Sequence, residues 1–72
     1  MEKLNLNIRM RRLELGLSQD ELAERLGYAD RSSIAKIETG VVDISIKQLK
    51  KIAVALETTP YDLIKYLWEE ES

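Results

Sequence analysis

Apolar residues recur at helical spacing along most of the chain, and no alternating run long enough for a β-strand is present. The one β-branched run, residues 41–44, is short and lies between two helical patterns. Five stretches with this spacing predict helices over residues 5–15, 19–26, 31–39 and 46–56, and a last helix that begins after residue 59. The pattern therefore predicts an all-α fold, a compact five-helix bundle.

Residues that favour helix caps agree with these boundaries. Ser18 and Glu21 form the S-x-x-E pattern of a capping box, and Asp30 is the expected N-cap of the third helix. Pro60 stands at the first position of the last helix, where its missing N–H has no cost. Each of the three glycines ends a predicted helix: Gly16, Gly27 and Gly40. The fourth helix is expected to direct these residues inward: Ile46, Leu49, Ile52, Ala53 and Leu56.

Composition narrows the functions that such a bundle can have. The 72 residues suffice for one domain with a marginal core, and the chain contains neither cysteine nor histidine. Zinc sites and ordinary nucleophile–base pairs need those residues, so we expect no enzyme, no metal and no cofactor. The absence of cysteine also suits a reducing compartment, and no run of 18 or more apolar residues indicates a membrane span. We therefore expect a cytoplasmic protein.

Charge is distributed unevenly along the chain. The net charge is −2, but residues 1–56 hold ten of the eleven basic residues and only eight of the thirteen acidic ones. Residues 57–72 hold one lysine and five acidic residues. Because binding depends on local potential, the acidic total does not exclude a nucleic-acid partner for the first part of the chain.

The second and third predicted helices are joined by a short turn after Gly27. This arrangement suits a helix-turn-helix, in which the outer face of the second helix enters a DNA major groove. On spacing alone, an ordinary αα-hairpin explains the pattern equally well. The outer face favours DNA, because Arg31, Ser32 and Lys36 point away from the isoleucines and such side chains reach base edges or phosphates.

The segments LGLSQDELAERLG and SSIAKIETG closely resemble the phage repressor and Cro (Xre-type) family of helix-turn-helix DNA-binding domains. The resemblance covers about residues 8–67 and implies a transcription regulator, chiefly a repressor, that binds double-stranded DNA and needs no small-molecule ligand. It implies base contacts from Gln19, Arg31, Ser32 and Lys36. The candidate phosphate contacts are Ser18, Arg9, Arg11, Tyr28, Thr39, Gly40 and Lys47.

One feature departs from the family pattern. Between Gly27 and Ile34 the chain has one residue more than the commonest spacing, and the extra residue falls in the Tyr28-Ala29 stretch, which lengthens the turn. We expect a longer turn, and the base contacts are therefore assigned to within about one residue. Tyr28 has two interpretations, a phosphate contact or packing on the turn.

Arg12 and Glu38 interrupt otherwise apolar faces of the first and third helices. Burying either charge alone costs several kcal/mol, so each needs a partner. The family resemblance pairs an arginine and a glutamate at these positions. We therefore predict a buried, bidentate Arg12–Glu38 salt bridge that orients the third helix.

The last helix carries large apolar residues that suit a dimer surface, and family members usually dimerise on a near-palindromic operator. The domain is predicted to span residues 1–68, followed by an acidic tail, 69–72, directed away from DNA. The alternative function is a protein-interaction module on the same scaffold, of antitoxin or antirepressor type. The candidate homodimer contacts are Tyr61, Ile64, Leu67 and Trp68.

Overall fold

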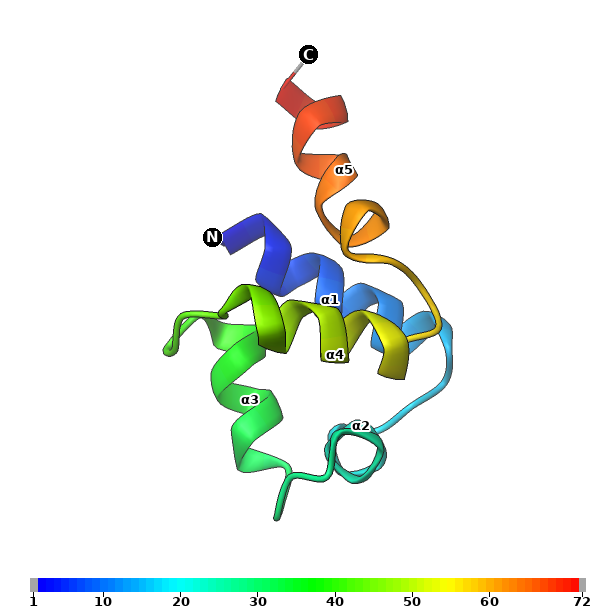
Figure 1. Cartoon of the computed structure of the whole chain (residues 1–72), viewed down its shortest axis with the longest axis vertical. Helices are drawn as coiled ribbons and strands as arrows, with labels where there is room; N and C mark the ends of the chain where they lie inside the picture. Colours follow the sequence, from blue (N-terminus) through cyan, green and yellow to red (C-terminus); the bar gives the residue numbers. More distant parts are fainter. Residues whose placement is uncertain (1, 72) are drawn as a thin grey trace.

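The computed structural model describes the backbone of residues 2–71 and the side chains of residues 4–65. Within this range the chain forms five helices and no strand, which confirms the predicted all-α bundle (Figure 1). The helices are α1 (Glu2–Glu14), α2 (Gln19–Leu26), α3 (Ser32–Thr39), α4 (Ile46–Ala55) and α5 (Pro60–Glu71). None of the helices in the described range is both long and apolar enough to cross a membrane.

The helices α1 and α4 lie across the middle of the molecule (Figure 1). The helix α1 packs against α3 and α5, whereas α2 packs against α3 and α4, and α4 also contacts α5. The turn between α2 and α3 therefore lies at one end of the long axis, and α5 leads away at the other end (Figure 1). This arrangement separates the helix-turn-helix from the acidic C-terminal part of the sequence.

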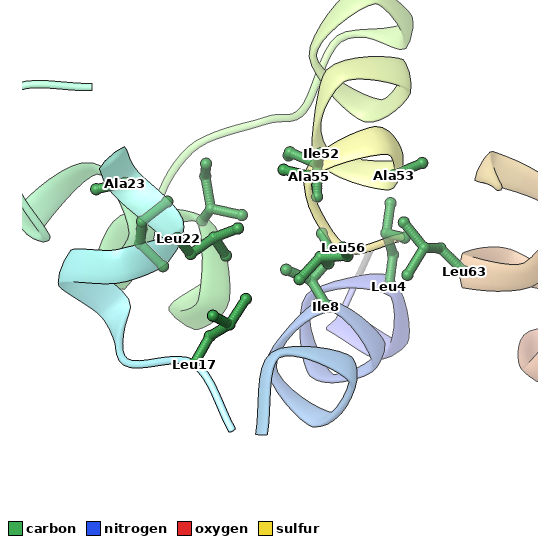
Figure 2. Packing of buried hydrophobic residues seen from close by; sticks show 12 residues of the cluster. Leu4, Ile8, Leu17, Leu22, Ala23, Ile52, Ala53, Ala55, Leu56 and Leu63 are labelled. Carbon is green, nitrogen blue, oxygen red and sulfur yellow. The ribbon is translucent and has the colours of Figure 1, made fainter. Parts of the chain in front are cut away.

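The core lies where the apolar stripes of the helices meet. Figure 2 shows side chains from α1, α2, α4 and α5 converging on this region. The isoleucines of α3 complete it, and Leu22, Ile52 and Leu56 are fully buried. Burial of such side chains stabilises a fold by about 1.5–3 kcal/mol each. The buried apolar residues are Leu4, Ile8, Leu17, Leu22, Ala23, Ile34, Ile37, Ile52, Ala53, Ala55, Leu56 and Leu63.

Helix ends are satisfied by local hydrogen bonds. Capping boxes begin α2 at Ser18 and α4 at Ser45, and only the first was predicted. After α1, α2 and α3, a glycine with positive φ follows the helix, and the next amide bonds the carbonyl five residues back, as in a Schellman motif. The end of α4 has the same bonding pattern, but Glu57 takes the left-handed position at φ 57°.

The structure corrects two details of the sequence analysis. Asp30 is not the N-cap of α3, because the helix begins at Ser32 and Arg31 occupies the cap position without a side-chain cap bond. Ile46 does not face inward and is 74% exposed. The buried face of α4 centres on Ile52 and Leu56, and Ile46 lies at its edge on the first residue of the helix.

Candidate nucleic-acid interface

The two faces of α3 have opposite character. Ile34, Ile37 and Glu38 are buried against the rest of the domain. Ser32 and Lys36 are exposed on the other face, one helical turn apart, and Arg31 is exposed just before the helix. Three of the four side chains predicted to touch base edges, Arg31, Ser32 and Lys36, are therefore exposed at α3, and the two charged ones are basic.

The start of α3 is organised by Asp30. Its Oδ1 atom accepts a hydrogen bond of 2.9 Å from the Ser32 amide and also accepts from the Ser32 hydroxyl. The bond from the Ser32 hydroxyl, followed by that from its amide, lowers the pKa of the Asp30 carboxyl. The Ser32 proton is therefore engaged within the domain, and this hydroxyl is left as an acceptor toward a ligand.

The end of α3 is closely packed. The Thr39 hydroxyl donates to the Ala35 carbonyl at 2.8 Å, and the Gly40 amide donates to Ile37 at 3.3 Å. Gly40 has φ 78°, and a Cβ atom there would lie 2.7 Å from the Nδ2 atom of Asn5. The backbone donor expected at a phosphate is thus already bonded within the helix cap.

A buried ion pair fixes α3 from behind. The Arg12 Nε and Nη2 atoms donate to the two carboxylate oxygens of Glu38 at 2.7 and 3.0 Å, and Nη1 donates to the Leu17 carbonyl at 2.8 Å. Only 8% of the arginine side chain and 3% of the glutamate side chain are exposed. The hydrogen bond to Glu38 raises the pKa of Arg12 against the effect of burial. The two residues paired in the sequence analysis therefore make two parallel bonds between α1 and α3.

The start of α2 joins the same network. The Gln19 Nε2 atom donates to the Glu38 Oε1 atom at 3.3 Å, so one carboxylate connects α1, α2 and α3. The Ser18 hydroxyl accepts from the Glu21 amide at 3.0 Å, while the Glu21 carboxylate accepts from the Ser18 amide. That backbone bond lowers the pKa of Glu21. The bond from Gln19 to Glu38 was not predicted, because no local pattern in the sequence indicates it.

Arg11 lies in a different environment from the other proposed phosphate contacts. Its Nε and Nη2 atoms donate to the carbonyls of Leu56 and Glu57 at 3.0 and 3.2 Å, which places it at the end of α4. Arg9 and Lys47 are exposed, whereas Tyr28 is half-buried and packs against the core. The structure thus brings the α3 residues and Gln19 together and places Arg11 elsewhere.

A second arginine, which was not predicted from the sequence, also lies at the end of α4. The Arg25 Nη1 atom donates to the Ala55 carbonyl at 2.9 Å and to the Glu57 carboxylate at 3.0 Å. Cations favour a helix C-terminus, where carbonyls are unpaired. The sequence contains only an indirect indication. No glycine follows α4, so the carbonyls at the end of this helix need other partners.

Two of the proposed dimer contacts are described. Tyr61 is 68% exposed, whereas Ile64 is half-buried and packs against the core. The side chains of Leu67 and Trp68 lie outside the described residues, as does the tail 69–72 apart from its helical backbone to Glu71.

The fold and this exposed helix define the class of protein, a helix-turn-helix DNA-binding transcription regulator. The helix-turn-helix family model matches residues 8–63, and the chain belongs to this family. No curated protein matches the chain.

Solved structures show the same relationship. The restriction-modification controller protein C.AhdI from Aeromonas hydrophila is 35% identical, with 86% of this chain and 92% of that chain covered and a TM-score of 0.79. The controller C.Esp1396I is 32% identical, with 96% and 88% covered and a TM-score of 0.83, and a tetramer of it is known with its natural 35 base-pair operator. The regulator ClgR from C. glutamicum shares the fold at 22% identity, with 99% and 91% covered and a TM-score of 0.87.

Proposed function

We propose that this chain is a sequence-specific repressor that binds a near-palindromic operator as a homodimer, with α3 in the major groove. The observation that carries the proposal is the two-sided α3, with Glu38 held from behind and Arg31 and Lys36 free on the solvent side. The known operator complex of the 32% identical C.Esp1396I supports a DNA target of this kind. A dimer bound at a promoter would block polymerase. This mode of repression does not require a ligand-binding domain.

The proposed base contacts differ in strength. Arg31 can bind guanine through two parallel hydrogen bonds, and Lys36 can reach an adjacent acceptor. Ser32 can only accept while its proton is bonded to Asp30, which suits a base amino group. The Gln19 Nε2 atom donates to Glu38, so its Oε1 atom is proposed to accept a hydrogen bond from a base.

A second group of residues is proposed to contact phosphates. Ser18 at the start of α2, Lys47 at the start of α4, and exposed Arg9 are retained. Thr39 can turn its hydroxyl from Ala35 toward a phosphate. We leave Arg11, Tyr28 and Gly40 out of the proposal because their polar or packing groups are already engaged within the domain.

Homodimerisation is proposed to use α5, which leads away from the helix-turn-helix (Figure 1) and on which Tyr61 is exposed. Two copies would then present their α3 helices to half-sites about 34 Å apart, one turn of DNA. The negative charge of residues 57–72 would lie away from the phosphates. A cytoplasmic location follows from this proposal.

The test is selection of binding sites from a random double-stranded library, followed by affinity measurements on the selected operator. Arg31→Ala should weaken binding by about 1–3 kcal/mol and relax specificity at one base pair. Lys47→Ala, the matched contrast, should weaken all sequences alike and reduce the salt dependence of binding. Unchanged operator affinity of Arg31→Ala would refute the assigned recognition face.

The alternative, a protein-interaction module, is supported by the exposed apolar Tyr61 and the acidic total charge. A salt titration against random DNA separates the two functions. A DNA-binding regulator binds weakly and loses affinity steeply as salt rises. No binding at low salt would favour the protein-interaction module.

A further inference from the structure

A groove between α2 and α4 carries a combination of properties that DNA binding leaves unexplained. It is a shallow depression open to solvent, with a volume of about 400 Å³, and is lined by Arg25 and Leu26 of α2 and by Lys50, Lys51, Val54 and Ala55 of α4. The groove combines an apolar surface with basic residues.

The apolar part is unusually accessible. Val54 is 78% exposed, the largest exposed fraction among the large apolar side chains of the described residues. Leu26 is half-buried beside it, and Ala55 is buried at the base. A single exposed apolar side chain is common on protein surfaces, so Val54 indicates a partner only together with the charges beside it.

The charged rim is positive. Arg25 is neutralised by Glu57, with 3.0 Å between its Nη1 atom and the carboxylate, whereas Lys50 and Lys51 are exposed. None of the lining residues is acidic. The groove therefore favours an occupant that carries both apolar groups and carboxylates.

The chain itself contains such a segment. Residues 66–71 read Tyr-Leu-Trp-Glu-Glu-Glu, three large apolar residues followed by three carboxylates. This segment does not reach the α2–α4 groove of its own chain, because α5 packs against α1 and α4 and leads away from α2 (Figure 1). The same segment of a second copy is not restricted in this way.

We propose that the C-terminal segment, residues 66–71, of one copy docks in the α2–α4 groove of another copy. The segment combines apolar and acidic residues, which complements the exposed Val54 and the basic Lys50 and Lys51 of the groove. This inference rests on the proposed homodimer and specifies a contact that holds it together. The dimer then involves α2 and α4 as well as α5.

The test uses charge reversal in the full chain without DNA. Sedimentation velocity over a concentration series measures self-association of the wild type, of Lys50→Glu with Lys51→Glu, and of Glu69→Lys with Glu70→Lys. Each double variant should weaken association at least about tenfold, because like charges then meet across the interface. Combining all four substitutions restores opposite charges, and we expect association to recover toward the wild-type value.

A matched control applies the same change of charge to the recognition face. Arg31→Glu with Lys36→Glu should lose operator binding but retain self-association, so that failure of the proposed DNA function and failure of the docked segment are distinguishable. Circular dichroism checks that each variant folds, as expected for exposed positions.

Three results would overturn the docking. The wild type could remain monomeric, the groove variant could associate as well as the wild type, or the four-substitution variant could stay as weak as its parents. If the groove variant instead loses only DNA affinity and salt dependence, the groove contacts phosphates and the inference is wrong.

Discussion

Arg11 and Arg12 are neighbours on α1, yet they stabilise the ends of two different helices. Arg12 is buried and bonds a carboxylate of α3, whereas Arg11 is half-buried and bonds two carbonyls at the end of α4. The α3 end also packs Gly40 against Asn5, while the α4 end has exposed Glu57 in the left-handed position. Water can replace the bonds at the α4 end but not the buried pair. Substitutions at the α3 end should therefore destabilise the fold more than substitutions at the α4 end.

The largest expected effect is on the buried pair. Arg12→Ala should lower the free energy of unfolding by about 3–5 kcal/mol, because Glu38 would remain buried without its partner. Arg11→Ala, the neighbouring control, should lower it by about 1–2 kcal/mol, because water replaces bonds to carbonyls. Urea unfolding of both variants measures the difference. Equal losses would contradict the contrast between the two helix ends.

The next largest loss of stability is expected from adding a side chain at Gly40, where a neighbouring residue lies close to the backbone. Gly27→Ala should cost about 1–2 kcal/mol, because it has φ 74° and no neighbouring atom within 4 Å of a new Cβ. Gly40→Ala should cost about 0.5–1.5 kcal/mol more, because the Asn5 side-chain amide would have to shift away from the new Cβ. Thermal unfolding compares the two. Adding Asn5→Ala to Gly40→Ala should recover part of the difference, and no recovery would exclude this clash as the cause.

Replacing both members of the ion pair separates stability from orientation. Arg12→Met with Glu38→Leu should remain within about 2 kcal/mol of the wild type, because no buried charge is left unpaired. If the pair orients α3, operator affinity should still fall at least about tenfold, which equals about 1.4 kcal/mol. Unfolding and operator binding are measured on the same preparation. If the double variant binds the operator with wild-type affinity, the ion pair stabilises the fold but does not orient α3.

The smallest change is expected at the exposed end of α4. Glu57→Gly should alter the free energy of unfolding by less than about 1 kcal/mol, since relief of the left-handed backbone offsets loss of an exposed ion pair with Arg25. Glu57→Gln keeps the backbone strain and removes the charge, so it should be slightly less stable than the wild type at low salt. Urea unfolding at two salt concentrations distinguishes these contributions. A large loss in Glu57→Gly would mean that the ion pair dominates.

Much of the fold could be predicted because its signals are local. The spacing of apolar residues located all five helices, and Ser18, Gly27 and Pro60 marked ends that the structure confirms. The start of α3 lies one residue later than predicted, with Arg31 at the cap position, although the Ser32 amide donates to Asp30 as expected. The inward prediction for Ile46 was wrong because periodicity gives the direction of a side chain and not whether another helix covers it.

The sequence by itself determined the helix pattern, the absence of cysteine and histidine, and the two charges on apolar faces that require each other. Only the tertiary structure decided that Gln19 shares Glu38, that Arg11 and Arg25 meet at the end of α4, and that α2 and α4 form a basic groove. The reason is physical. Helical spacing depends on near neighbours in the chain, whereas these contacts join residues from different helices and depend on how the helices pack.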